Sequence, residues 1–387
     1  MIELAKTEMG RVKVQVVGIG NAGGTIVKRV ARERLPGVEI AAINTALKDL
    51  GNVGNISEIR QLQIGTELTR GHGAGMDPQV GRKAALEDAN RIRDFIGSNE
   101  LVFLIGGFGK GTGTGATPVI GELAREQGAL VFAFVTTPFD HEKRCHHEIA
   151  EEGLREIQGK VDAYVPLSNQ RLYGMPSLVT YEAACAFMDE VILQAIRAIV
   201  DVVLRGGRMS LDLADLRTLF KGAGLAAFST GYGKGEGRVA SVARGLSEYP
   251  FVQPGQFEQA RHMLVSISGG PDLGLREVDE LSAEIGKLAA GEPKTATGIY
   301  QDESLQGELR AMVLAAGLDP VEPSRAEYEL FAGRDQAARA GAPLHRPAGW
   351  SGRPRGAATE REAVPVVDDN IEVPAYLRKP RNGPARG

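Results

Sequence analysis

Residues 12–140 alternate between short apolar runs and longer segments in which apolar residues recur at helical spacing. Residues 12–44 read as a buried strand, a glycine turn, an amphipathic helix and a second strand that ends near Asn44. A helix is expected around residues 80–96, and the apolar runs ELVFLIGGFG and ALVFAFVTTP flank the helical segment TPVIGELAREQG. Alternating strands and helices predict a mostly parallel sheet covered on both faces, with ligands at the carboxyl ends of the strands.

The second half of the chain predicts one long helix and a smaller α/β domain. Residues 178–204 carry apolar residues at helical spacing and stop before Arg205-Gly206-Gly207, where a helix C-terminus is expected. Beyond them, the strands MLVSISGG and ELRAMVLAAG alternate with the helices PGQFEQARH and LREVDELSAEIGKLA. The predicted fold class is therefore α/β, with a Rossmann-like parallel-sheet domain, a long central helix and a second, smaller α/β domain.

The last part of the chain differs in composition from the rest. Residues 321–369 are rich in Pro, Gly and Arg and lack apolar periodicity, which is typical of a disordered linker. Residues 370–380 bring Ile371, Val373, Tyr376 and Leu377 close together. An apolar peptide on a disordered tether predicts a segment that binds a partner protein.

Composition and charge exclude several classes of protein. A chain of 387 residues with 43% apolar residues has room for two domains, and its net charge of −4 argues against general nucleic-acid binding. We find neither a signal peptide nor an apolar run near the ~20 residues of a membrane span, so a cytoplasmic protein without membrane insertion is expected. The two cysteines are expected to be reduced thiols.

The glycine cluster at residues 18–24 follows a predicted strand and opens a predicted helix. Glycines there let the backbone approach an anion, and the helix N-terminus supplies free N–H groups and a positive partial charge. The pattern also fits a dinucleotide fingerprint, which needs an acidic residue at the end of the second strand. That strand ends in Asn44-Thr45-Ala46, so a nicotinamide-dependent oxidoreductase remains only as a less favoured alternative.

A second glycine cluster, at residues 106–115, alternates glycine with small hydroxyl residues directly before a helix. Its N–H groups and two Thr hydroxyls would form a phosphate cradle, to which Lys110 could add a point charge. The cluster is not a Walker A loop, because Lys110 is followed by Gly111 instead of Ser or Thr. A tight strand-helix turn alone rarely needs so many glycines, so phosphate binding is the favoured interpretation.

Several blocks together resemble the tubulin/FtsZ superfamily of GTPases, specifically its bacterial FtsZ branch. GGFGKGTGTGATPV resembles the family's signature loop, TRGHGAGMDPQVGRKAA its third nucleotide loop, and LDLADLR its catalytic loop. SGGPDLGL and NIEVPAYLRK are further matches in the same order. The resemblance implies a GTP-binding domain at 11–177, a central helix at 178–204, a C-terminal α/β domain with the catalytic loop at 205–320, a flexible linker at 321–369 and a partner-binding peptide at 370–380.

The resemblance also implies which residues bind GTP or GDP. Those expected at the phosphates are Gly20, Asn21, Ala22, Gly23, Gly24, Gly73, Ala74, Gly75, Gly109, Lys110, Gly111, Thr112, Gly113 and Thr114. Glu142 would meet the ribose, and Asn169, Arg171 and Asp189 would lie near the sugar or guanine. His146 stands where the family has a phosphate-reaching Arg, with Arg144 offset from it as a further candidate.

Asp212 and Asp215 are the expected catalytic residues. They are one helical turn apart, and paired carboxylates can polarise water or hold a cation. An acid at the N-cap followed by another three residues later is also an ordinary helix start, and without the resemblance that interpretation is favoured. The resemblance implies that both reach into the next subunit's site and position the attacking water, so that the active site is complete only in a polymer.

No transition-metal site is predicted. Residues 140–148 hold many metal-ligand types, but their spacing matches no compact zinc pattern and Lys143 and Arg144 would repel a cation. We interpret this segment as a charged loop beside the nucleotide. Mg²⁺ is the expected companion of a nucleoside triphosphate.

The chain departs from the family pattern at several positions around the site. Thr25 replaces an Asn that touches guanine, Ala46 an Asp, Lys110 a glycine, and Ser210 an Asn of the catalytic loop. Cys185 replaces an aromatic residue that stacks on the base, with Phe187 nearby as a candidate substitute.

These departures leave two hypotheses beside the oxidoreductase. The favoured one is a GTPase that polymerises into protofilaments in cell division, attached at the division site through Ile371–Lys379 to membrane-tethering or other division proteins. The other is a divergent, filament-forming paralogue with weak hydrolysis that acts in cell shape or division regulation.

Overall fold

The computed structural model describes residues 12–54, 56–175, 180–204 and 211–319. The predictions for residues 321–369 and 370–380, and for Ser210, lie outside these described residues.

The described strands form one sheet in the order β3-β2-β1-β4-β5-β6-β7-β10-β8-β9. The first six strands are parallel, as the sequence predicts. They are β1 (Val14–Ile19), β2 (Val38–Asn44), β3 (Ile59–Gln63), β4 (Leu101–Gly107), β5 (Leu130–Thr137) and β6 (Ala163–Ser168). Because the inner parallel strands are buried on both faces, their sequences are almost continuously apolar, and Phe103, Leu104 and Ile105 of β4 are fully buried.

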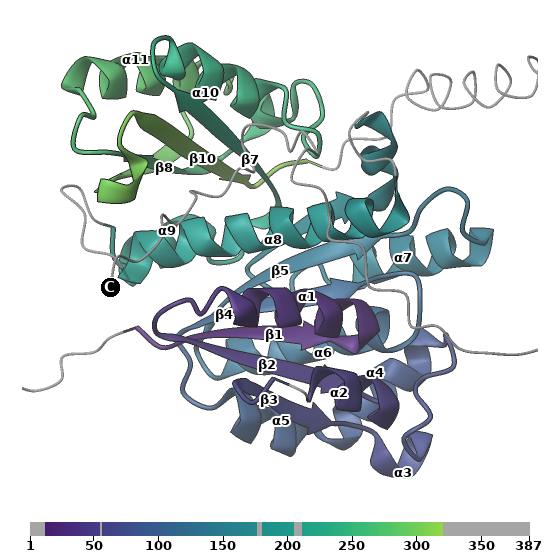
Figure 1. Ribbon diagram of the computed structural model, residues 1–387. Helices are drawn as coiled ribbons and strands as arrows, with labels where there is room; N and C mark the ends of the chain where they lie inside the picture. Colours follow the sequence, from purple (N-terminus) through teal and green to yellow (C-terminus); the bar gives the residue numbers. More distant parts are fainter. Residues whose placement is uncertain (1–11, 55, 176–179, 205–210, 320–387) are drawn as a thin grey trace, which may run out of the picture. The chain divides into compact units, whose positions relative to one another are not determined.

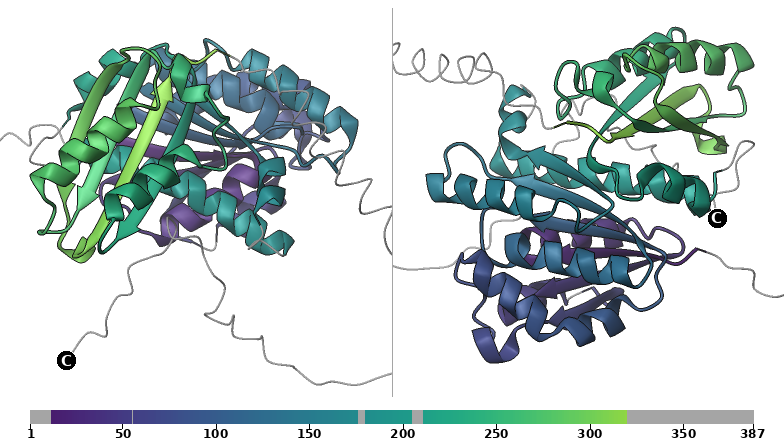
Figure 2. Two further views of the ribbon diagram at one scale, coloured as in Figure 1. Left: turned by 90° about the horizontal axis from the view of Figure 1, so that it is seen from above. Right: turned by 180° about the vertical axis from the view of Figure 1, so that it is seen from behind.

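Helices cover both faces of this parallel part (Figures 1 and 2). One face packs against α1 (Gly20–Arg32), α2 (Leu47–Val53) and α8 (Tyr181–Leu204). The other face packs against α4 (Pro78–Glu87), α5 (Ala89–Ile96), α6 (Thr112–Glu126) and α7 (Arg144–Glu156). The short helix α3 (Thr66–Thr69) precedes α4, and η1 (Asn169–Gly174) follows β6.

The second part of the sheet is mixed. Here β10 (Glu308–Ala316) runs antiparallel to both β7 (Gly224–Lys234) and β8 (His262–Gly269), and β8 pairs in parallel with β9 (Lys294–Gln301). Two residue pairs, Ala163 with Gly224 and Tyr164 with Leu225, join it to β6. The remaining elements are α9 (Leu213–Phe220), α10 (Arg238–Ser247), η2 (Gln256–Gln259), α11 (Leu275–Gly286) and η3 (Glu303–Leu305).

The central helix α8 packs against both parts of the sheet. Ile192, Ile196 and Ile199 of α8 share one hydrophobic cluster with Phe132 of β5 and with Leu314 of β10. Full burial of each isoleucine contributes about 1.5–3 kcal/mol. Helices α10 and α11 cover the other face of the mixed part with a separate cluster.

The structure corrects three predicted elements. The helix expected around residues 80–96 is two helices, because Asp88 separates them and its carboxylate accepts from Gly65 N at 2.7 Å. The segment PGQFEQARH forms only the short turn η2. The segment interpreted as a charged loop at residues 140–148 becomes helical at Arg144, where α7 begins.

Candidate functional site

Three loops meet at the carboxyl edge of the parallel strands. One joins β1 to α1, one joins β4 to α6, and the third precedes α4. Their backbones approach so closely that a Cβ added to Gly20 would lie 3.1 Å from Gly113 N, and one added to Gly111 would lie 2.6 Å from Ala74 Cβ. The structure therefore brings together the three glycine segments that the sequence analysis placed at the phosphates.

The first loop leaves the N-terminus of α1 open. Helix α1 begins at Gly20, whose φ is 72°, and no side chain caps it at Ile19. A Cβ on Gly23 would come within 2.2 Å of Ile105 O, so only glycine allows α1 to start this close to β4. Asn21 and Ala22 are exposed there, and the first N–H groups of α1 can bind an anion.

The signature loop leaves a second helix N-terminus open. Helix α6 begins at Thr112, and its N-cap residue Gly111 provides no side-chain acceptor. Thr114 Oγ1 accepts from Gly109 N at 3.0 Å, which closes the loop on itself, and Lys110 is exposed on it. A Cβ on Gly113 would lie 2.3 Å from Gly107 O. The N-termini of α1 and α6, each with a partial positive charge, therefore lie next to each other at the carboxyl edge of the sheet.

The third loop adds a run of backbone with positive φ next to the hydroxyl groups at the end of β2 and the start of α6. Gly73, Gly75 and Met76 all have positive φ, at 89°, 59° and 66°. The loop is tied to the end of β2 by an antiparallel bridge between Ala46 and His72. Thr45 Oγ1 lies 2.7 Å from Thr112 Oγ1, which connects the end of β2 to the start of α6.

The charged candidates beside the loops are differently placed. Glu142 accepts from Phe139 N at 3.2 Å and lies 3.1 Å from Nδ1 of His146, which is buried. A Cβ on Gly109 would lie 3.0 Å from His146 O, so His146 belongs to the wall of the signature loop. Arg144 is 93% exposed and pairs with Glu148 along α7. The structure therefore brings His146, more than Arg144, to the loop.

A half-buried carboxylate, Asp189, lies in the first half of α8. Burial, together with the charge of Glu190, raises the pKa of Asp189 to about 6, although Arg29 acts in the opposite direction. Arg29 itself is paired with Glu190. Asn169 and Arg171 lie in η1, which follows β6 at the same edge of the sheet. A carboxylate with a perturbed pKa in such a place is typical of a ligand site.

Phe187 is wrong as a substitute for the stacking aromatic residue. It is 6% exposed and stacks on Phe251 at 6.4 Å in the core. The sequence analysis overlooked Tyr181, which is 68% exposed and stands one turn before Cys185 on α8. The spacing of four residues between the two was the signal that could have identified it.

Asp212 and Asp215 form a capping box at the start of α9. Asp215 N donates to Asp212 Oδ1 at 2.9 Å, and Asp212 N donates to Asp215 Oδ2 at 3.0 Å. Both residues are exposed, and among the described residues the other oxygen of each carboxylate has no hydrogen-bond partner. Asp212 and Asp215 can therefore cap α9 and still use their second carboxylate oxygens in a reaction.

The two aspartates lie far from the glycine loops of the same chain. On α9, Arg217 Nη2 donates to Glu100 O at 3.3 Å, and Glu100 directly precedes β4, whose opposite end leads into the signature loop. Seven residues of strand span roughly 20 Å. Figure 1 shows α9 beside the C-terminal end of α8, at the left of the view.

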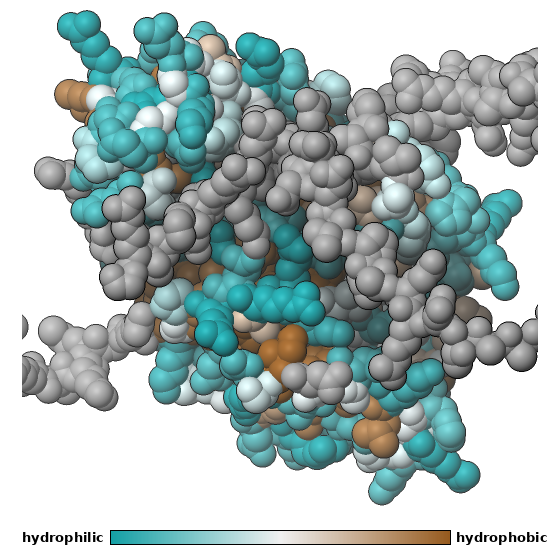
Figure 3. Space-filling model, viewed as in Figure 1, coloured by the Kyte–Doolittle hydropathy of each residue, from teal (hydrophilic) through white to brown (hydrophobic). Residues whose placement is uncertain are grey.

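Neither a metal cluster nor a membrane span is found within the described ranges. These residues contain no group of three or more His, Cys, Asp or Glu side chains that could hold a metal ion. None of their helices is both long and apolar enough to cross a membrane. Hydrophilic residues cover most of the described surface viewed in Figure 3.

Family models match both parts of the chain. The GTPase domain of the tubulin/FtsZ family matches residues 13–177, and the C-terminal domain of the FtsZ family matches residues 224–319. The first match favours GTP over a nicotinamide dinucleotide as the ligand of the three loops.

Curated relatives extend the similarity to nearly the whole chain. The cell division protein FtsZ of Pseudomonas aeruginosa is 34% identical over 394 residues, which cover 98% of this chain and 99% of the relative. Cell division protein FtsZ 2 of Rhizobium meliloti is 37% identical over 314 residues, which cover 81% of this chain and 90% of the relative.

Solved structures agree with this similarity. An empty FtsZ dimer from M. jannaschii has a TM-score of 0.73 at 30% identity and covers 79% of this chain and 88% of its own. CetZ2 from Haloferax volcanii, a GTPγS-bound protofilament, has a TM-score of 0.68 at 20% identity over 85% of this chain and 99% of its own, which supports the fold alone. The chain therefore belongs to the FtsZ family and carries the GTP-binding GTPase domain of the tubulin/FtsZ superfamily.

Proposed function

We propose that this chain polymerises head to tail and hydrolyses GTP between subunits, as a cytoskeletal protein of cell division. The observation that supports the proposal is the separation of Asp212 and Asp215 from the glycine loops. One chain presents the loops at the carboxyl edge of the parallel strands and the aspartates near the amino edge. Head-to-tail stacking brings the aspartates of one subunit onto the loops of the next, as a heterologous interface that propagates into a filament.

The glycine loops bind the phosphates in this proposal. The open N-termini of α1 and α6 and the exposed Lys110 stabilise the charge that develops on the γ-phosphate. Asp212 and Asp215 of the neighbouring subunit hold the attacking water through the carboxylate oxygens that the capping box leaves open. Glu142, Asn169, Arg171 and Asp189 hold the ribose and guanine.

Mg²⁺ fits this site as a companion of the phosphates. The donors near the loops are the hydroxyl oxygens of Thr45 and Thr112, which are 2.7 Å apart. Hard oxygen ligands suit Mg²⁺, which keeps several waters and is held largely by phosphate oxygens. When bound, the ion would neutralise phosphate charge.

The C-terminal peptide attaches the filament in this proposal. Similarity to the Pseudomonas aeruginosa protein covers 98% of this chain, and the apolar peptide Ile371–Lys379 is suited to bind a membrane-tethering or division protein at the division site.

The first test measures GTP turnover and light scattering against protein concentration with Mg²⁺ present. Wild-type turnover should appear only above the concentration at which scattering begins. Asp212→Ser removes the carboxylate but keeps a side chain that caps α9, because Ser is also a good N-cap residue. This variant should assemble and hydrolyse at least 100-fold more slowly, since a general acid–base group contributes roughly 10²–10⁴-fold.

Complementation tests the arrangement between subunits. Gly75→Asp places a negative charge in the third loop, where no atom lies within 4 Å and where Asp tolerates a positive φ. Neither Gly75→Asp nor Asp212→Ser should hydrolyse GTP alone, but an equal mixture should recover roughly a quarter of the wild-type rate, the fraction of pairings that join two intact halves. Absence of recovery in filaments that contain both variants would contradict catalysis between subunits. Wild-type assembly without turnover would support the weakly hydrolysing paralogue.

A further inference from the structure

Four aromatic rings pack together around the segment that follows β5. Phe139 is 5% exposed and lies at their centre. His141 stacks on it at 5.1 Å, Tyr173 meets it edge-on at 5.8 Å, and Tyr181 lies tilted against it, also at 5.8 Å. Tyr173 and Tyr181 remain 60% and 68% exposed. Phe139 thus supports two exposed rings at the edge of the sheet where the nucleotide loops end.

Tyr181 shares its helix face with Asp189, a residue proposed for the base. It begins α8, and Cys185 and Asp189 follow it at intervals of four residues on the same helix face. The Cys185 thiol, burial, a hydrogen bond with that thiol and the charge of Glu142 together raise the pKa of the Tyr181 hydroxyl. The hydroxyl therefore lies beside the Cys185 thiol.

Neither Cys185 nor Phe187 of α8 can offer an exposed ring to the guanine base. Cys185 has no ring, and Phe187 is buried against Phe251. Purine bases stack on exposed aromatic faces, and Tyr provides such a face at low entropic cost.

We propose that Tyr181 supplies the ring on which the guanine base stacks, while Asp189 contacts the edge of that base. This inference rests on the proposed GTP-binding function and assigns one residue of its base-binding part. Tyr173 does not share the role, because its hydroxyl lies 3.2 Å from His141 Nδ1 and it comes from η1 instead of α8.

The test compares GDP dissociation constants of single variants, measured by displacement of a fluorescent GDP analogue. Tyr181→Ala should weaken GDP binding by about 5- to 150-fold, the range for loss of one stacked base. Tyr181→Phe keeps the ring and should stay within about twofold of wild type. Tyr173→Ala is the matched control, since it removes an equally exposed tyrosine from the same cluster, and it should also bind GDP as wild type does.

Two further measurements separate base stacking from other effects. Inorganic pyrophosphate has no base, so its competition with the fluorescent analogue should give the same pyrophosphate dissociation constant in wild type and Tyr181→Ala. Cys185→Phe added to Tyr181→Ala restores a ring one turn away and should recover most of the lost affinity. The thermal midpoints of all variants without nucleotide should agree, because Tyr181 is exposed.

Three outcomes would overturn the inference while leaving GTP binding intact. These are wild-type GDP affinity in Tyr181→Ala, equal losses in Tyr181→Ala and Tyr173→Ala, or an equal loss of pyrophosphate affinity. Failure of the wild-type protein to bind GDP would instead overturn the proposed function itself. The two failures are therefore distinguishable in one set of titrations.

Discussion

Two regions of this molecule can be compared at a helix that starts in a glycine turn: the starts of α1 and α6, which we call the open region, and the start of α11, which we call the closed region. At α1 and α6, no side chain caps the N-terminus. At α11, Glu277 folds back to accept from Gly274 N at 2.9 Å, so a carboxylate of the chain itself lies at the helix N-terminus. A glycine turn before a helix is therefore not enough to predict an anion site. The site also requires that the chain leave the helix N–H groups free.

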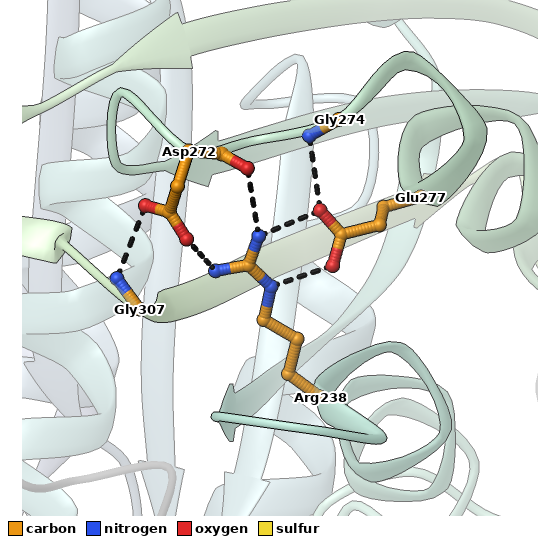
Figure 4. A network of polar contacts seen from close by, with 5 residues as sticks. All are labelled: Arg238, Asp272, Gly274, Glu277 and Gly307. Carbon is orange, nitrogen blue, oxygen red and sulfur yellow. Dashed lines mark hydrogen bonds and ion pairs between the residues drawn. The ribbon is translucent and has the colours of Figure 1, made fainter.

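The closed region is a complete polar network (Figure 4). Arg238, whose side chain is 7% exposed, donates to both carboxylate oxygens of Glu277 at 2.6 Å and to Asp272 Oδ2 at 2.6 Å. Asp272 Oδ1 in turn accepts from Gly307 N at 3.1 Å. The network ties α10, the loop before α11 and the turn before β10 together, so its charges are paired within the chain and stabilise the fold.

The pKa values of the carboxyl groups in the two regions are shifted in opposite directions. Hydrogen bonds, from Arg238 to Glu277 and from Gly307 N to Asp272, lower the pKa of these carboxyls. Burial raises the pKa of Asp189. Partners within the chain thus lower the pKa of the two structural carboxyls, whereas burial raises that of Asp189, as expected for the base-binding role proposed for it.

The largest effect is expected from a substitution within the signature loop of the open region. Gly113→Ala adds a Cβ that would lie 2.3 Å from Gly107 O, so the signature loop must move. We expect GDP binding to fall by roughly 100-fold or more, because small displacements of a binding group are costly. The free energy of unfolding should also fall by about 2–3 kcal/mol, as for an overpacked site. GDP titration and urea denaturation measure the two effects.

Gly274→Ala is the matched control in the closed region. Its added Cβ would lie 3.5 Å from Glu277 Oε2, an ordinary contact, at a φ of −85°. This variant should be neutral or stabilised by up to about 1 kcal/mol, because Ala restricts the unfolded chain. Equal losses of GDP affinity and stability in Gly113→Ala and Gly274→Ala would contradict the distinction between the open and the closed region.

The second effect should be on stability alone. Arg238→Met keeps much of the side-chain volume but leaves two acidic partners without their cation. We expect a loss of about 2–3 kcal/mol, below the usual cost of breaking a buried pair, since the side chains of Asp272 and Glu277 are 32% and 28% exposed. GDP affinity of the folded variant should not change.

Arg261→Met provides the control for that measurement. Arg261 pairs with Asp319 at 3.4 Å, and both side chains are more than half exposed. Its loss should cost less than about 1 kcal/mol, as for other surface pairs. Weaker GDP binding in Arg238→Met than in Arg261→Met would show that the network also serves the nucleotide site.

The third effect is a pH dependence of binding. Protonated Asp189 loses acceptor capacity for the N–H groups of guanine, so GDP affinity should fall by about 10-fold between pH 7 and pH 5 if its pKa is about 6. Asp189→Asn should bind more weakly at pH 7 with a flatter profile. The pH dependence of pyrophosphate affinity serves as the control, because pyrophosphate has no base. If GDP affinity depends on pH in Asp189→Asn as it does in wild type, this role of Asp189 is refuted.

The smallest effect should distinguish charge from capping in the network. Glu277→Gln keeps an acceptor for Gly274 N but loses the charge opposite Arg238, and should cost about 1 kcal/mol at pH 7. Because the pKa of Glu277 is lowered on folding, its stabilisation is present above its unfolded pKa of about 4.3 and is lost as pH falls through the lowered folded value. The difference between wild type and Glu277→Gln should therefore shrink in acid. A pH-independent difference would assign the whole cost to capping.

Local sequence patterns predicted the parallel core and the glycine loops at the carboxyl ends of its strands. The strands β1, β2, β4 and β5 were visible because burial on both faces makes them continuously apolar. In contrast, β3 at the sheet edge alternates buried and exposed residues over only five positions, and β9 begins with exposed residues. Such strands are defined by their neighbours and leave a weak signal of their own.

The parts of the molecule that could not be predicted from the sequence are those assembled from distant segments. The aromatic cluster joins residues 139, 141, 173 and 181, and the Arg238 network joins residues 238, 272, 277 and 307. Phe187 was a wrong substitute for a local reason. Two residues beyond Cys185 on a helix face away from it, whereas Tyr181, four residues before, shares its face.

The length of α8 has a consequence for how the proposed filament handles its nucleotide. Its 24 residues span about 36 Å, which keeps a subunit's aspartates away from its own GTP. Each filament then has one terminal subunit whose nucleotide is uncovered and another whose aspartates have nothing to act on. If hydrolysis takes place between subunits as proposed, exchange with free nucleotide would be confined to the uncovered terminus, and each nucleotide would be hydrolysed only after its junction had formed.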